Sequence, residues 1–192
     1  MIQFYKPNKA TTGNACSFWL NKDGSIMASM IKQDSWDNAK RRGTFSKNKG
    51  NPHKSVITKL SRVEVAGIID AIESNREWSA YHRSQKQVLT MKFCPYLRNG
   101  DQIGFSFSIN KQDAEDSTKK SSYVIGLYFP EGRLLKHDLE VFLDKTLKIE
   151  AEVIKVHPAF TRDAPPVTEH DLEQVASGGS EASDPFEDGE IF

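Results

Sequence analysis

Residues 56–72 read VITKLSRVEVAGIIDAI, and this stretch decides the fold because it joins a strand directly to an amphipathic helix. Val56–Leu60 is rich in β-branched and apolar residues, which predicts a strand. Ser61 followed by Glu64 is a capping-box pattern, in which each side chain satisfies a backbone N–H of the other residue at a helix start. The apolar residues that follow lie at helical spacing and predict one packing stripe: Val65, Ile68, Ile69 and Ile72. We expect this helix to end near Ser74.

A second copy of this plan follows about 70 residues later, counted between the two strand-to-helix junctions. Residues 123–129 predict the strand, Pro130-Glu131-Gly132 leads into the helix, and the stripe consists of Leu135, Leu139, Phe142 and Leu143. Upstream of the two units, alternating apolar residues and turn signals predict hairpins over 15–33 and 88–109. The sequence therefore predicts an α+β fold built as a duplicated strands-plus-helix unit, with an OB-fold as the alternative.

Three segments are less regular. Residues 38–54 are rich in Lys, Arg, Gly and Asn and predict a loop, which leaves room for a short strand at Thr44-Phe45-Ser46. Residues 111–122 predict a second polar loop. In residues 146–156, the alternation of Leu147, Ile149, Ala151 and Val153 favours a strand, although the Glu- and Lys-rich composition also fits an extension of the preceding helix.

The charges of the chain are divided along its length. All 26 Lys and Arg residues lie at or before Arg162, whereas nine of the 26 acidic residues lie from Asp163 onward. The first 162 residues therefore contain 17 acids and carry a formal charge of +9, and the last thirty carry −9. A basic globule with an acidic tail is typical of a nucleic-acid binder whose tail masks the binding surface.

The domain organisation follows this division. We expect one nucleic-acid-binding domain over residues 1–160, with halves of about 1–80 and 81–160. Residues 161–192 lose periodicity and contain linker chemistry such as Ser177-Gly178-Gly179-Ser180, which predicts a disordered acidic tail.

Several classes of protein lack support. No apolar run is long enough to cross a membrane, and Cys16 and Cys94 suit two buried thiols in a reducing compartment, so we expect a soluble cytoplasmic protein. The five histidines have no metal-ligand spacing, and no phosphate-loop or nucleophile-elbow motif occurs. We therefore expect no enzyme activity, no metal and no cofactor.

The binding candidates are cations and aromatic rings. Residues 40–54 place six positive charges among Gly, Asn and Ser, with Phe45 inside and Trp36 just upstream. Cations attract phosphates, and rings offer stacking platforms to unpaired bases at ~1–3 kcal/mol each. A solvated loop without a ligand is the alternative. For residues 76–86, a second basic and aromatic stretch, packing and binding are equally supported. The residues that we predict to bind DNA are Trp19, Lys32, Trp36, Lys40, Arg41, Arg42, Phe45, Lys47, Lys49, Lys54, Arg76, Trp78, Tyr81, Arg83 and Lys86.

The extreme C-terminus combines carboxylates with a terminal apolar pair. A solubilising tail has no need to end in Ile-Phe, and such an end suits a small apolar pocket rimmed by Arg or Lys on another protein. A plain acidic tail is the alternative. The predicted partner-binding residues are Asp184, Phe186, Glu187, Asp188, Glu190, Ile191 and Phe192.

Two resemblances add to these patterns. The ending Glu187-Asp188-Gly189-Glu190-Ile191-Phe192 resembles the tails of bacterial and phage single-stranded-DNA-binding proteins, with Ile191 where that family has Pro. The resemblance implies that the tail recruits replication and repair proteins and competes with DNA for the basic groove.

The body is instead similar to the Whirly and positive-coactivator (p15-like) superfamily, through the strands-then-helix unit used twice and the local match Ile57–Glu64. Phe4-Tyr5-Lys6-Pro7-Asn8 and Asp34-Ser35-Trp36-Asp37 also resemble segments of single-stranded-DNA-binding proteins of tailed phages. The architectural resemblance spans about residues 1–145. It implies two antiparallel sheets packed crosswise with helices on one side, DNA across strands and loops, and a monomer or a homo-oligomer.

Together these features favour a non-enzymatic protein that binds single-stranded DNA without sequence preference in replication, recombination or repair. Its expected partners are single-stranded DNA and, through the tail, replication or recombination proteins. The alternatives are a transcription coactivator or RNA-binding protein on the same fold, and a protein-interaction adaptor whose basic loop meets an acidic partner.

Overall fold

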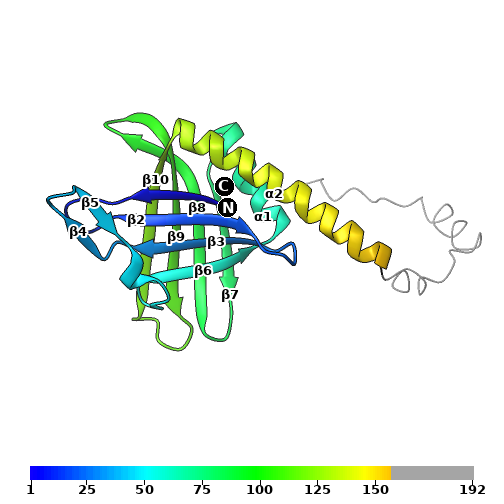
Figure 1. The fold of residues 1–192 in the computed structure, drawn as a ribbon, viewed down its shortest axis with the longest axis horizontal. Helices are drawn as coiled ribbons and strands as arrows, with labels where there is room; N and C mark the ends of the chain where they lie inside the picture. The colour runs from blue at the N-terminus through cyan, green and yellow to red at the C-terminus, as the bar shows by residue number, and fades with distance from the viewer. Residues whose placement is uncertain (157–192) are drawn as a thin grey trace, which may run out of the picture. The chain divides into compact units, whose positions relative to one another are not determined.

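The computed structural model describes residues 1–156, which form two four-stranded antiparallel sheets, a short two-stranded hairpin and two α-helices (Figure 1). The elements in chain order are β1 (Ile2–Lys6), β2 (Asn14–Leu20), β3 (Ile26–Lys32), β4 (Ser35–Asp37), β5 (Arg42–Thr44), the 3-10 helix η1 (Ser46–Asn48), β6 (Ser55–Leu60), α1 (Arg62–Ser74), β7 (Trp78–Arg83), β8 (Gln87–Arg98), β9 (Asp101–Asp113), β10 (Lys120–Tyr128) and α2 (Phe129–Val156).

The two large sheets cross each other. The first has the order β1-β2-β3-β6 and the second the order β10-β9-β8-β7, and Figure 1 shows their strands running in crosswise directions. Alternate residues of each strand face the other sheet, and rings meet between them, with the centroids of Phe18 and Phe107 5.4 Å apart. The core lies between the sheets and extends over the buried sides of α1 and α2, and each sheet keeps a second face directed away from the other sheet.

The strand-to-helix junction has the structure that its sequence predicts. Ser61 is the N-cap of α1 and forms a capping box with Glu64, and Asn75 ends the helix in the left-handed conformation with a φ of 57°. Helix α1 packs closely against β7 at Gly67, where a Cβ would lie 2.3 Å from Nε1 of Trp78. The buried side of α1 consists of Val65, Ile68, Ala71 and Ile72.

Helix α2 is longer than the sequence pattern predicts, and the strand expected over residues 146–156 is wrong. Thr146 lies one turn beyond Phe142 and continues the buried stripe, and its hydroxyl donates to the carbonyls of Phe142 (2.9 Å) and Gly24 (3.0 Å). Extending an existing helix costs no new nucleation, and Glu and Lys are good helix formers. The alternation of apolar residues in this segment is therefore secondary to helix propagation.

Both polar loops are shorter than expected. Residues 38–54 contain β5 and η1, and Phe45 and Ser46 follow the strand instead of belonging to it. Strand β9 continues to Asp113 and β10 begins at Lys120, with Gln112 opposite Lys120, so residues 114–119 alone connect them. Polar side chains at these strand ends face solvent, where they do not prevent backbone pairing.

Two independent sheets replace the single closed barrel that an OB-fold would require. Both cysteines are free, with Cys16 buried and Cys94 half-buried. Among the described residues, no helix is both long and apolar enough to cross a membrane. The predicted acidic tail, residues 161–192, lies outside the described residues.

Candidate nucleic-acid interface

Residues 33–54, here called the basic loop, connect β3 to β6 and are fixed to the sheet by a buried glutamine. Gln33 is only 5% exposed. Its side-chain oxygen accepts from the backbone N–H of Asn8 (2.9 Å), and its Nε2 donates to the carbonyls of Asn8 (3.0 Å) and Ser35 (2.8 Å). One amide therefore ties the segment after β1 and the start of β4 to the end of β3.

A carboxylate and a second amide hold the far side of the basic loop. Asp34 accepts from the hydroxyl of Thr44 and from the backbone N–H of Lys47 (2.8 Å), and these hydrogen bonds, the one from Thr44 first, lower the pKa of Asp34. Asn48 donates to the carbonyls of Lys32 (2.9 Å) and Gln33 (3.2 Å). These hydrogen bonds fix the backbone of the basic loop, so its cations have a defined arrangement.

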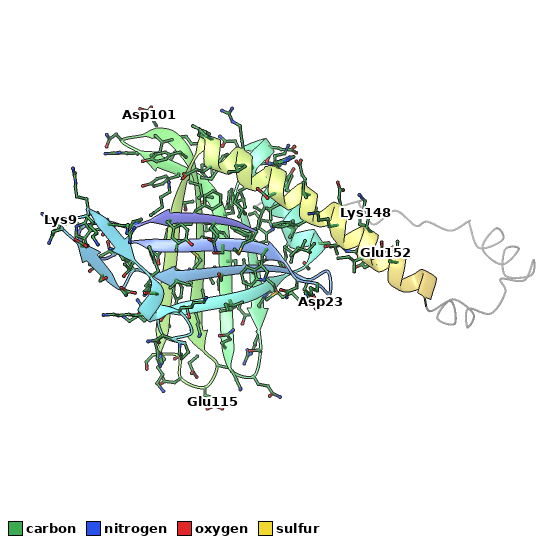
Figure 2. The ribbon with its side chains drawn as sticks, viewed as in Figure 1. Lys9, Asp23, Asp101, Glu115, Lys148 and Glu152 are labelled. Carbon is green, nitrogen blue, oxygen red and sulfur yellow. The ribbon has the colours of Figure 1, made fainter. Side chains whose placement is uncertain are left out.

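The cations of the basic loop lie at the surface. Within residues 1–156, none forms an ion pair with a carboxylate, and all are exposed: Lys40, Arg41, Arg42, Lys47, Lys49 and Lys54. Two cations of the helices do pair with carboxylates: Lys136 lies 2.9 Å from Glu73 and Arg62 lies 2.8 Å from Glu150. Figure 2 shows the two regions well apart, with Lys9 labelled beside the loop and Lys148 and Glu152 on α2.

Aromatic rings border these charges. The rings of Phe45 and Tyr5 are 5.8 Å apart and tilted by 59°, and Tyr5 is 56% exposed on β1. Trp36 is half-buried on β4 opposite Gly43. Two predicted ring residues of the basic loop therefore lie among its cations, and Tyr5 joins them from the first strand.

At the same end of the first sheet, the side chain of Lys32 lies over an aromatic ring of the second sheet. Its ammonium lies 5.1 Å from the ring centre of Tyr123. Lys32 and Lys54 also line one small hollow together with Ser122 of β10. The end of β3 and the end of the basic loop thus place two predicted cations beside the second sheet.

A larger hollow lies next to this segment and contains lysines that the sequence patterns did not single out. We call it the lysine hollow; its lining residues are Pro52, His53, Lys86, Gln87, Lys111, Asp113, Thr118, Lys119, Lys120 and Ser121. It brings the predicted Lys86 next to the end of the basic loop. Lys111, Lys119 and Lys120 were missed because they lie in a polar segment without an aromatic residue, and the pairing of β9 with β10 brings Lys111 beside Lys119 and Lys120.

The remaining predicted residues lie elsewhere. Trp19 is half-buried on the outward face of β2, near the turn that follows this strand and away from the basic loop, and its Nε1 donates to Asn21 (2.9 Å). Trp78 packs against α1, and Arg76 follows α1 with Asp70 at 3.7 Å. Tyr81 and Arg83 are exposed on β7. The structure therefore places Trp19, Arg76 and Trp78 away from the basic loop, whereas Arg83 lines a small hollow with Ile57, Thr58 and Lys59 of β6, the strand that follows the loop.

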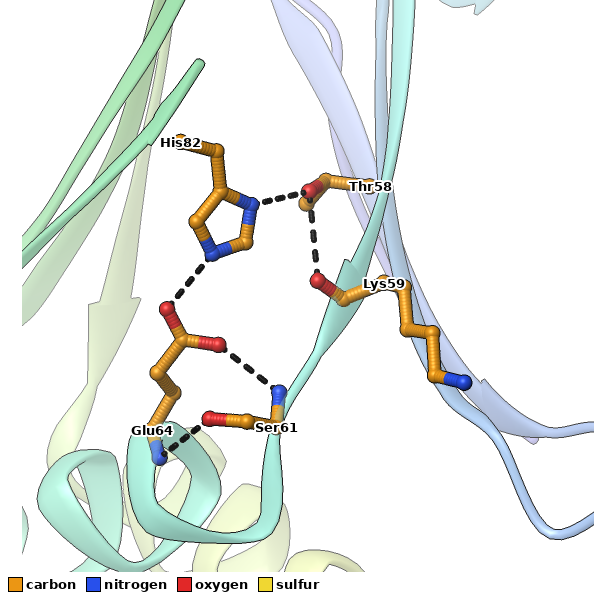
Figure 3. Close-up of polar contacts among 5 residues, drawn as sticks. All are labelled: Thr58, Lys59, Ser61, Glu64 and His82. Atoms are coloured by element: carbon orange, nitrogen blue, oxygen red, sulfur yellow. Dashed lines mark hydrogen bonds and ion pairs between the residues drawn. The ribbon is translucent and has the colours of Figure 1, made fainter. Parts of the chain in front are cut away.

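Polar contacts join the edge strands of the two sheets near α1 (Figure 3). His82 on β7 lies 3.0 Å from the hydroxyl of Thr58 on β6 and 2.6 Å from the carboxylate of Glu64. The other carboxylate oxygen of Glu64 accepts from the backbone N–H of Ser61 (2.7 Å). Partial burial raises the pKa of Glu64, but the hydrogen bonds from Ser61 and His82 outweigh it and hold the pKa below 4.5. The contact set fixes the sheets and α1 relative to one another.

No protein-family model and no curated protein matches the sequence. Solved structures with a similar fold are WHY3 from Arabidopsis thaliana (15% identity, 82% of this chain and 94% of that chain, TM-score 0.55) and the plant transcriptional regulator PBF-2 (15%, 91% and 94%, 0.55). WHY1 from Arabidopsis thaliana is also similar (14%, 85% and 94%, 0.55). These are Whirly proteins, so the expected Whirly-like α+β fold is confirmed. At this identity the likeness concerns the fold.

Proposed function

We propose that this protein binds single-stranded DNA without sequence preference through the basic loop and the rings beside it. The observation that carries the proposal is a loop with six exposed cations, none in an ion pair within residues 1–156, anchored by Gln33 and Asp34 beside Tyr5 and Phe45. The Whirly-like fold adds support, because the resemblance to the Whirly superfamily implies binding of single-stranded nucleic acid.

The division of labour within the interface follows from its chemistry. The cations compete with salt ions for backbone phosphates, so the affinity for DNA falls as the ionic strength rises. For a single strand, each phosphate contact makes the slope of log K against log salt concentration steeper by about 0.7. The rings stack on unpaired bases, whose faces a duplex keeps hidden. Neither contact reads base edges, which is why sequence preference should be weak.

The cellular role that we propose is replication, recombination or repair, with no enzymatic step. The acidic tail competes with DNA for the basic loop and presents Phe192 to replication or recombination proteins. This assignment rests on the tail sequence, with nine carboxylates and an Ile-Phe end. Substituting Phe192→Ala should leave the affinity for DNA unchanged and abolish co-purification of a replication partner. Retained co-purification would refute the proposal that Phe192 binds this partner.

Transcription regulation or RNA binding is the second candidate. The similarity to PBF-2, described as a plant transcriptional regulator, favours it. The same loop chemistry would serve either role, because phosphates and unpaired bases occur in RNA as well. Relative affinity for deoxy- and ribo-oligomers separates DNA binding from RNA binding.

The test is a titration of intrinsic tryptophan fluorescence with poly-dT, poly-U and duplex DNA at low salt. We expect strong quenching by poly-dT, weaker binding of the duplex, and loss of affinity in the variant K40Q/R41Q/R42Q. The matched control, R133Q/K145Q/K148Q, removes the same number of exposed cations from α2 and should bind as the unaltered protein does. Absence of quenching by poly-dT at low salt would refute the proposal.

A further inference from the structure

The lysine hollow lies between the end of the basic loop and the second sheet, and two contacts hold its walls together. The ammonium of Lys111 on β9 donates to the carbonyl of Pro52 (2.8 Å), and the hydroxyl of Ser121 on β10 donates to the carbonyl of His53 (3.3 Å). The β7–β8 turn contributes Lys86 to the rim. The hollow is thus formed by segments far apart in the sequence that the fold fixes in place.

Positive charge dominates the lining. Four lysines face one carboxylate, Asp113. The Asp113 carboxylate accepts from the backbone N–H groups of Glu115 (3.0 Å) and Asp116 (3.1 Å), which lowers its pKa, so it serves the β9–β10 turn. Among residues 1–156, Lys119 alone of the four pairs with a carboxylate, that of Asp116 at 3.3 Å. Like charges gathered in this way repel one another unless an anion joins them.

The ligand chemistry follows from what lines the hollow. Its lining contains lysines, hydroxyls, amide and carboxylate groups and a His side chain, and no Phe, Tyr or Trp ring. Lysine ammonium groups bind phosphates as point charges, whereas unpaired bases need rings for stacking. The hollow therefore suits the phosphates of a nucleic-acid backbone, and its single imidazole, that of His53, is a smaller stacking surface than a Phe, Tyr or Trp ring.

The hollow is continuous with the basic loop. Pro52 and His53 form one wall, and Lys54, the next residue, lines the small hollow that also contains Lys32. Neighbouring residues of β10, Ser121 and Ser122, line one hollow each. A chain of cations therefore leads from the loop across the end of β3 to the ends of β9 and β10.

We infer that the lysine hollow is a second, phosphate-only subsite for the same nucleic-acid strand, which stacks its bases at the basic loop and lays its onward backbone on Lys86, Lys111, Lys119 and Lys120. This inference rests on the proposed function. It divides the path into a segment that recognises unpaired bases and a segment that recognises phosphates alone.

The test compares two triple variants by fluorescence titration over a series of salt concentrations. K86Q/K119Q/K120Q keeps Lys111 and its contact to Pro52, and it should lower the salt slope of log K for long poly-dT by about 2, since about 0.7 is lost per phosphate. It should bind an oligomer too short to leave the loop as tightly as the unaltered protein does. The maximal tryptophan quenching should stay unchanged, whereas K40Q/R41Q/R42Q should weaken the binding of the short oligomer as well.

The outcomes separate the two claims. If the unaltered protein binds no poly-dT, the proposed function and the inference both fail. If it binds and K86Q/K119Q/K120Q has the salt slope of the control R133Q/K145Q/K148Q, the inference alone fails. Inorganic pyrophosphate is the small-anion probe: a pyrophosphate-induced rise in melting temperature that the hollow variant loses, without any change in its DNA binding, would overturn the assignment to a nucleic-acid backbone.

Discussion

At the residue scale, Gln33 anchors the loop that we propose to bind DNA, without itself belonging to the charged surface. Its amide is buried and makes three hydrogen bonds to the backbone of Asn8 and Ser35. A buried backbone group that loses its hydrogen-bond partner costs about 1–3 kcal/mol of stability, because it has given up its contact with water and makes none in the protein. The orientation of the basic loop thus depends on a side chain that carries no charge.

Substituting Gln33→Ala should therefore release the basic loop without unfolding the sheets. Hydrogen exchange should accelerate at residues 35–48 and remain slow in β8 and β9, and the affinity for poly-dT should fall. Substituting Gln112→Ala, a half-buried glutamine without a side-chain hydrogen bond among the described residues, is the control. Unchanged exchange in the loop would show that Gln33 does not anchor it.

A second residue-scale prediction concerns the contact between α1 and β7. A Cβ on Gly67 would lie 2.3 Å from Nε1 and 2.4 Å from Cδ1 of Trp78, so Gly67→Ala requires the indole or the helix to move. Overpacking of this kind costs about 1–3 kcal/mol of unfolding free energy. Urea denaturation measures the loss, and Ala66→Ser, on the exposed side of the same turn, should change stability little. Equal stabilities of the two variants would contradict the close packing.

At the element scale, the junction of β6, α1 and β7 depends on the ionised form of Glu64. The pKa of Glu64 lies below 4.5 in the folded protein. A lowered folded-state pKa means that this stabilisation is fully present above pH 4.5 and is lost as the pH falls through the folded pKa. The edge strands of the two sheets should therefore loosen in acid.

The corresponding variant is Glu64→Gln, which keeps the shape of the capping box and removes the charge. Hydrogen bonds to a charged group contribute more to stability than those between neutral groups. We therefore expect Glu64→Gln to lower the free energy of unfolding by about 1 kcal/mol at pH 7, and this loss should shrink below pH 4.5. Urea denaturation across this pH range checks it, with Glu115→Gln, an exposed residue on the β9–β10 turn, as the control. A loss that stays constant with pH would assign the effect to shape.

The elements differ in how far the sequence predicts them. Residues 56–72 were predictable because strand, cap and helix stripe are local signals that agree with one another. The end of α2 was not, since alternation and helix propensity point to different structures at Leu147 and Ile149. The lysine hollow was not predictable either, because Lys111 and Pro52 are 59 residues apart and only the packing of the second sheet against the segment before β6 brings them together.

At the scale of the whole molecule, the formal charge of zero hides two opposed halves of the charge distribution. Residues 1–162 carry +9 and residues 163–192 carry −9. Among residues 1–156, the cations of the basic loop and three of the four lysines in the lysine hollow have no carboxylate partner, and under the proposed function the anionic tail would compete with DNA phosphates for them. Tethering keeps the effective concentration of this competitor high.

Deleting residues 163–192 should therefore tighten binding to poly-dT, most strongly at low salt, and the gain should vanish as salt screens both interactions. Fluorescence titrations over a range of salt concentrations measure it. The control is a chain of full length in which the nine tail carboxylates are replaced by their amides, which keeps the length and removes the charge. If charge is the cause, this chain binds as tightly as the truncated one. If it binds as the unaltered protein does, steric exclusion by the tail is the cause, and unchanged affinity in both would refute competition by the tail.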